Sequence, residues 1–198
     1  MWEERYATPD YLFGKDPSIF ITEKTEYLKA GQTALVVADG EGRNSVFMAE
    51  QGLVVTAMDG AANAVAKAEK LAAERGVSVD FKVADILQWD WDAVQYDLVV
   101  GIFIQFVGPD ARAGIFEGMK RSLKPGGMLL LHGYTPEQIE LGTGGPPFVE
   151  NMYTKEILAD SFGDFEILAL NAYHREVQEG RGHSGMSALI DLVAQKPL

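Results

Sequence analysis

The sequence predicts a doubly wound, Rossmann-like α/β fold with a mostly parallel sheet, and three observations lead to it. Short apolar runs rich in β-branched residues alternate with amphipathic helical stretches up to residue 132. The first run, residues 33–38, breaks into the turn Asp39-Gly40-Glu41-Gly42 and then into a helical stretch. Two further runs near the C-terminus have no helix between them, which indicates an antiparallel hairpin at one sheet edge. We therefore expect a sheet of seven strands.

Each expected element follows from its local pattern. Seven mostly apolar runs bounded by turn residues are the predicted strands: 33–38, 53–58, 77–83, 96–102, 128–132, 165–172 and 187–195. Helical periodicity predicts helices over 43–51, over 61–75 with Gly76 as C-cap, and from Pro109 onward. Shorter helices are predicted over 23–28 and over 154–161, the latter with Thr154 as N-cap.

The chain suits a single domain over residues 1–198, with two segments that regular elements do not explain. Residues 1–30 carry many aromatic side chains among turn signals, and we expect a lid segment whose Tyr11 and Phe13 face the ligand. The alternative is that these rings only cap the core. Residues 134–153 are rich in glycine and proline, and we expect an active-site loop there.

Composition disfavours several functional classes. The chain has a net charge of −12, whereas a protein that tracks a nucleic-acid backbone or an anionic membrane needs a basic face. It has no cysteine, which removes disulfides, a thiol nucleophile and thiolate metal sites. The N-terminus does not resemble a signal peptide, and no apolar run approaches the roughly 18 residues of a membrane span. We expect a cytoplasmic monomer or homodimer that acts on a small molecule.

Acidic residues follow three successive predicted strands: Asp39, Asp59 and Asp85. In an open α/β sheet, ligands bind beyond the carboxyl ends of the strands. Asp59 lies 19 residues after Gly40, the spacing at which an acid after the second strand reaches the two ribose hydroxyls of a nucleotide. The alternative is that Asp59 only caps the next helix. The glycine turn also loosely fits the dinucleotide fingerprint, but the closing hairpin and the lack of a separate substrate domain disfavour a dehydrogenase.

This combination resembles the class I S-adenosylmethionine (SAM)-dependent methyltransferases over nearly the whole chain. The glycine turn matches their first motif, Asp59 their ribose-binding acid and Ala84-Asp85-Ile86 their adenine-side motif. Tyr96 to Val100 and Leu123-Lys124-Pro125-Gly126-Gly127 match the fourth strand and the turn before the fifth. Within this class, the N-terminal Trp2-Glu3-Glu4-Arg5-Tyr6 and the 142–147 glycine-proline loop resemble the tellurite-resistance (TehB-type) and thiopurine methyltransferase group.

The resemblance implies SAM as cofactor and a set of cofactor-binding residues around the strand ends: Ala38, Asp39, Gly40, Gly42, Asn44, Asp59, Gly60, Asp85, Ile86, Leu87, Ile102 and Gln105. Two positions depart from the family. Val36 stands where the first motif usually has an acid, and Ala38 where it has a glycine. We expect Asp39 to take over part of the missing polar role.

The acceptor is expected to be a small, soft sulfur, selenium or tellurium nucleophile, which needs orientation and a dry site more than proton removal. The fourth-strand loop lacks the Asp/Asn-Pro-Pro-Tyr sequence of nucleic-acid amino methyltransferases. His183, Arg181 and Tyr11 are the candidate catalytic residues, while His132 is equally well interpreted as a core residue and His174 as a solvated one. The alternatives are an NAD(P)-dependent oxidoreductase and a non-catalytic SAM-binding regulatory protein.

Overall fold

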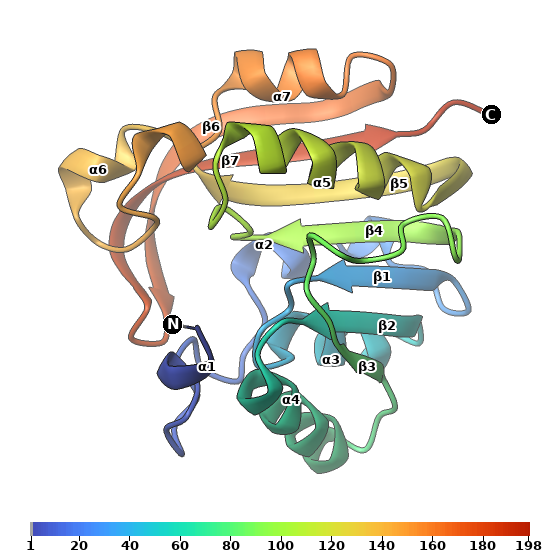
Figure 1. The fold of residues 1–198 in the computed structure, drawn as a ribbon, viewed down its shortest axis with the longest axis vertical. Coiled ribbons are helices and arrows are strands. Elements are labelled where there is room, and N and C mark those ends of the chain that lie inside the picture. Colours follow the sequence, from blue (N-terminus) through green and yellow to red (C-terminus); the bar gives the residue numbers. More distant parts are fainter. Residues whose placement is uncertain (1) are drawn as a thin grey trace. The chain divides into compact units, whose positions relative to one another are not determined.

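The computed structural model describes residues 2–198. Its seven strands are β1 (Thr33–Val37), β2 (Val54–Asp59), β3 (Asp80–Val83), β4 (Tyr96–Ile102), β5 (Leu123–Tyr134), β6 (Glu166–Glu179) and β7 (His183–Gln195). They form one sheet in the order β3-β2-β1-β4-β5-β7-β6 (Figure 1). The predicted α/β fold, with its antiparallel C-terminal edge, is confirmed.

Helices and 3-10 turns occupy the connections. The α-helices are α1 (Trp2–Arg5), α2 (Ile19–Thr22), α3 (Arg43–Glu50), α4 (Ala62–Arg75), α5 (Pro109–Arg121), α6 (Gln138–Leu141) and α7 (Lys155–Ser161). The 3-10 turns are η1 (Thr25–Tyr27) and η2 (Val149–Asn151). Within residues 2–198, none of these helices is long and apolar enough to cross a bilayer.

Contacts divide the chain into two compact units. The first comprises Met1–Trp89 together with Glu179–Gly182. In it, β2 pairs in parallel with both β1 and β3, and α4 runs beside β2 and β3 (Figure 1). Helices α3 and α4 also pack on each other, and they bury an apolar cluster of Val46, Leu71 and Ala72. This unit carries the glycine turn.

The second unit comprises Asp90–Gln178 and His183–Leu198. Strand β4 pairs in parallel with β5, and β5 pairs antiparallel with β7 from Met128 opposite Gln195 to Tyr134 opposite Leu189. Leu129, Leu130 and Leu131 in β5 are fully buried, as expected for a strand in the middle of a covered sheet.

The element boundaries differ most where polar residues alternate with apolar ones. The last two strands extend to Glu179 and back from His183, so the stretch between residues 172 and 187 is a long hairpin rather than a polar loop. Exposed residues alternate with less exposed ones from Tyr173 to Glu179, which suits a strand with one exposed face, while the many polar side chains hide the strand from a search for apolar runs. Strand β3 begins at Asp80 and β5 spans Leu123–Tyr134. The predicted 23–28 helix is wrong: α2 has already ended at Thr22, and only the 3-10 turn η1 (Thr25–Tyr27) lies in that range.

Two predicted helix caps are confirmed. Gly76 closes α4 with φ of 68°, and the Thr154 hydroxyl accepts the Ile157 N–H at 3.1 Å at the start of α7. The segment 134–153 is a mixture of short elements: it begins with the last residue of β5 and includes α6 and η2.

Candidate functional site

The glycine turn after β1 is built from three residues with left-handed backbone. Ala38, Gly40 and Gly42 have φ values of 48°, 62° and 86°, respectively. A Cβ atom on Gly42 would lie 2.6 Å from the Ala68 Cβ of α4, so this glycine allows α3 to start against α4. A Cβ atom on Gly40 would lie 3.0 Å from the Tyr6 hydroxyl oxygen. The alanine at position 38 carries backbone strain that a glycine would not.

Asp59, the predicted ribose ligand, binds the glycine turn directly. Its Oδ2 accepts the Gly40 N–H at 2.8 Å, and its Oδ1 accepts the Ala61 N–H at 2.9 Å. Burial raises the pKa of its carboxyl group. The carboxylate does not cap α4, whose N-cap residue is Ala61 with no side-chain cap; it closes a local turn before the helix and also fixes the glycine turn. Each oxygen retains a second lone pair that suits a ligand hydroxyl.

Asp39 is partly buried and accepts hydrogen bonds from the first turn of α3. Its Oδ1 accepts the Ser45 N–H at 3.4 Å, and its Oδ2 accepts a short hydrogen bond from the Ser45 hydroxyl. Burial, reinforced by the nearby Asp59 carboxylate, raises the Asp39 pKa to about 7. Asp39 therefore ties the glycine turn to the first turn of α3.

The predicted adenine-side residues lie in the turn after β3. Asp85 Oδ1 accepts the Leu87 N–H at 2.9 Å, and the Ala84 N–H donates to the Asp59 carbonyl at 2.9 Å. Ile86 is buried, whereas Leu87 is exposed. A Cβ atom on Gly60 would lie 3.7 Å from the Ala84 carbonyl oxygen, so the two turns run close together.

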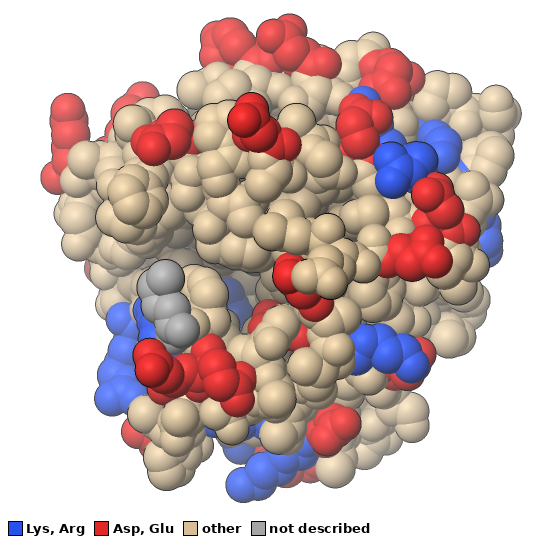
Figure 2. Space-filling view, viewed as in Figure 1, with Lys and Arg blue, Asp and Glu red and all other residues tan. Residues whose placement is uncertain are grey.

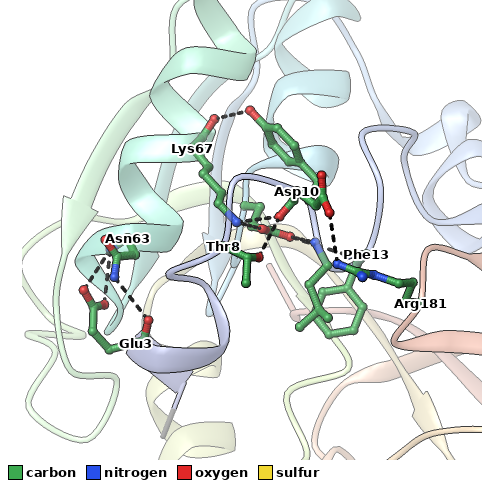
Figure 3. A network of polar contacts seen from close by, with 10 residues as sticks. Glu3, Thr8, Asp10, Phe13, Asn63, Lys67 and Arg181 are labelled. Atoms are coloured by element: carbon green, nitrogen blue, oxygen red, sulfur yellow. Dashed lines mark hydrogen bonds and ion pairs between the residues drawn. The ribbon is translucent and has the colours of Figure 1, made fainter.

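Residues of the N-terminal segment contact α4 and the hairpin turn (Figure 3). Tyr11 packs against the cluster under α3 and α4, and its hydroxyl donates to the Lys67 carbonyl at 2.9 Å. Arg181 is largely exposed and lies 3.4 Å from Asp10. Asn44 Oδ1 accepts the Ser18 N–H at 2.9 Å. Tyr11, Arg181 and Asn44 thus all contribute to holding the segment in place.

In the second unit, Ile102 is the last residue of β4 and is followed by Phe103 with φ of 56°. The predicted cofactor residue Gln105 is buried, and its amide bonds both polar groups of the Tyr134 backbone, at 2.6 and 2.8 Å. The amide therefore fixes the end of β5 beside the end of β4. Backbone strain of the kind seen at Phe103 is common at functional sites.

His183 is buried in an aromatic cluster. Its ring stacks on Phe103 at a centroid distance of 4.2 Å, and its Nδ1 forms a short hydrogen bond with the Tyr134 hydroxyl. The Tyr134 phenol can donate a hydrogen bond to Nδ1 or accept one from it. If the phenol donates, the neutral His183 ring carries its proton on Nε2; if it accepts, Nε2 is the acceptor nitrogen. The tautomer of His183 is thus coupled to Tyr134.

A second buried histidine, His132, is paired with Asp191, and the sequence does not predict this pairing. His132 Nδ1 lies 2.7 Å from Asp191 Oδ1, which also accepts the Tyr173 hydroxyl at 3.0 Å. A carboxylate only accepts, so it places the proton on Nδ1 and leaves Nε2 as the acceptor nitrogen of the neutral ring. His132 and Asp191 lie opposite each other in the β5–β7 register. His174, in contrast, is a half-exposed partner of Glu137.

No group of three or more metal-ligating side chains occurs among residues 2–198. Each unit offers its own polar groups: the first has carboxylates after its strands, and the second has imidazoles, an amide and a phenol. They can accept hydroxyl hydrogen bonds, hold protons and orient a small molecule.

Residues 34–127 match the family model described as a methyltransferase domain. A search of curated proteins found no match. A SAM-dependent methyltransferase from Methanosarcina mazei is 22% identical, with a TM-score of 0.74 over 92% of this chain and 99% of that one.

Two further solved structures have the same fold. TehB from Haemophilus influenzae is 18% identical with a TM-score of 0.72, over 98% of this chain and 65% of that one. The N-methyltransferase NodS from Bradyrhizobium japonicum, solved with S-adenosyl-L-homocysteine (SAH), is 15% identical with a TM-score of 0.72, over 100% of this chain and 97% of that one.

Proposed function

We propose that this chain, which has the class I methyltransferase fold and a methyltransferase domain at residues 34–127, transfers a methyl group from SAM to a small-molecule acceptor. The observation that supports this most is the pair of hydrogen bonds that the Asp59 carboxylate accepts from the Gly40 and Ala61 N–H groups. They hold a carboxylate at the spacing expected for ribose and, at the same time, shape the turn beside it.

The residues of the first unit fit SAM by their chemistry. Gly40 and Gly42 present backbone without side chains, and the Asp59 oxygens suit two adjacent hydroxyls. Asp85, Ile86 and Leu87 offer a polar and an apolar side to a flat base. When bound, SAM supplies the electrophilic methyl group of its sulfonium. The task of the protein is to orient both reactants and exclude water.

We propose a soft sulfur, selenium or tellurium nucleophile as the acceptor. An acceptor that is already anionic needs orientation, which Arg181 and His183 are proposed to provide. Among residues 2–198, no cluster of three or more potential metal-binding side chains occurs of the kind that a metal-dependent catechol methyltransferase would need. On the face in Figure 2, Lys and Arg side chains lie in separate small groups among acidic ones, which favours a small acceptor over a nucleic acid.

A non-catalytic SAM-binding role is the second candidate, and the strained alanine favours it. Ala38 has φ of 48° where the family has glycine, and Val36 lacks the usual carboxylate. Both changes weaken a cofactor site without altering the fold. An oxidoreductase has no such specific support.

Purified protein incubated with SAM and a panel of acceptors separates these functions. The panel contains small thiols, selenite, tellurite, phenols and amines, and SAH formation is followed. We expect SAH with the soft acceptors only. Tight SAM binding without SAH from any acceptor would favour the regulatory role. Binding of NADH but not of SAM would replace the proposal by an oxidoreductase.

A further inference from the structure

Residues 10–19, here called the strap, run from the N-terminal segment to the first residue of α2, between the glycine turn and the tip of the β6–β7 hairpin. Within the strap, Leu12 is held from both sides. Its N–H donates to Glu41 Oε2 at 2.8 Å, and its carbonyl accepts the N–H groups of Arg181 and Gly182 at 3.0 and 3.3 Å. The Phe13 N–H also points to Glu41, at 3.4 Å.

Glu41 itself is part of the predicted cofactor turn. Its side chain is almost fully buried and its other oxygen forms an ion pair with Lys67 at 2.7 Å. Lys67 in turn donates to the Asp10 carbonyl at 2.7 Å, at the start of the strap (Figure 3). One carboxylate in the turn thus sets the position of the strap backbone at three residues.

A second buried carboxylate holds the far end of the strap. Glu179 Oε1 accepts the Ile19 N–H at 3.0 Å and the Ser18 hydroxyl at 3.3 Å. Its Oε2 pairs with Arg43 at 2.7 Å, with both side chains about 6–7% exposed. Arg43 also donates to the Asp16 carbonyl at 3.4 Å. The first residue of α3 therefore joins the glycine turn to the strap.

Burying the charged groups of Glu41, Arg43 and Glu179 costs desolvation free energy. A buried charge must be compensated by its partners, and a buried ion pair adds little stability compared with apolar packing. What such contacts do provide is a fixed geometry. Glu41, Arg43 and Asn44 all point their polar groups at the strap, while Gly40 between β1 and Glu41 is held by Asp59. The conformation of the turn and the closure of the strap are therefore one linked arrangement.

We propose that Glu41 is a positioning residue that couples closure of the strap to cofactor affinity. This inference rests on the proposed function. Coupling between two sites is reciprocal. The factor by which a closed strap increases the affinity for SAM therefore equals the factor by which bound SAM shifts the strap toward its closed state. Glu41→Gln keeps the size of the side chain but removes the charge that binds Lys67 and the strap N–H groups.

The rate of trypsin cleavage after Lys15 measures how open the strap is, because Lys15 lies within the strap and its side chain is about two-fifths exposed. In the wild type we expect saturating SAH to slow this cleavage. In Glu41→Gln we expect faster cleavage and SAM affinity weaker by about tenfold, the effect of one lost charged hydrogen bond. Glu41→Asp should restore part of the affinity, which a merely structural role would not predict.

Glu74→Gln is the matched control. Glu74 pairs with Lys15 at 2.6 Å and also links the strap to α4, but both side chains are well exposed, so the pair contributes little. We expect its SAM affinity to equal that of the wild type. Glu179→Gln tests the other anchor and should behave as Glu41→Gln does if the strap closes as a unit.

Two results would overturn the inference in distinguishable ways. A folded Glu41→Gln variant that binds SAM as tightly as the wild type, with its strap cleaved faster, would show that the strap and the cofactor are uncoupled. A wild type that binds neither SAM nor SAH would overturn the proposed function and, with it, the coupling. Thermal unfolding of each variant shows whether a loss of affinity reflects a loss of fold.

Discussion

The carboxylate of Asp59 holds the backbone of Gly40: Oδ2 accepts the Gly40 N–H at 2.8 Å, across the ends of two neighbouring strands. The acid predicted to bind ribose is therefore also the group that shapes the turn. A ligand bound at this turn would contact both the Asp59 carboxylate and the Gly40 backbone. A substitution of Asp59 should therefore change the affinity for the ligand directly and also by moving Gly40.

Asp59→Ala should weaken SAM binding by about tenfold to a hundredfold, since one or two charged hydrogen bonds are lost. Titration calorimetry measures this directly. Asp80→Ala at the exposed start of β3 is the control and should leave affinity unchanged. An Asp59→Ala variant that is folded and binds SAM normally would remove Asp59 from the cofactor site.

Ala38→Gly should stabilise the first unit by about 1 kcal/mol, because a left-handed φ strains an alanine more than a glycine. Urea unfolding measures the change in the free energy of unfolding. Ala34→Gly in the same region, within ordinary strand backbone, is the opposite control and should destabilise. If Ala38→Gly also lowers stability, the backbone at residue 38 carries no strain.

Asp39 should make stability fall as pH rises from about 4 to about 7. Its pKa is raised from 3.8 to about 7 in the folded protein, so the folded state binds a proton that the unfolded state has already released. The stabilisation is full below pH 4 and is lost as pH rises through about 7. Asp39→Asn cannot ionise, so its free energy of unfolding should vary less with pH.

Urea unfolding at pH 5 and pH 8 tests this expectation. The wild type should lose more stability than Asp39→Asn between the two values. An identical loss in both proteins would assign the pH dependence to other groups, among them Asp59, whose raised pKa acts in the same direction.

His183→Ala should raise the KM of the acceptor more than it lowers kcat, the signature of lost binding. Tyr134→Phe removes the partner of His183 Nδ1 while keeping the ring beside Phe103, and a similar but smaller effect is expected. A fall in kcat of about a hundredfold with unchanged KM, restored by raising the pH, would instead make His183 a general base. The acceptor would then be a phenol, alcohol or amine.

His132→Asn, measured in the same assay, separates the two histidines. If the Asp191 pair only holds β5 and β7 together, this variant should lower the unfolding temperature without changing the pH profile of kcat. A pH profile that loses its acidic limb would place the proton transfer on His132.

Local patterns in the sequence determined that seven strands exist, though not the full length of the last two, and also determined the glycine turn and the caps at Gly76 and Thr154, because each depends on residues only a few positions apart. The spacing of Asp59 from Gly40 was also readable, since the length of one βα unit sets it. The tertiary structure alone decided that Glu179 anchors Ser18 and Ile19, that Glu41 holds Leu12, and that His132 faces Asp191. These partners are separated by 161, 160, 29 and 59 positions. Strand register brings His132 to Asp191, and the path of the strap across the fold brings the others together, neither of which a local pattern encodes.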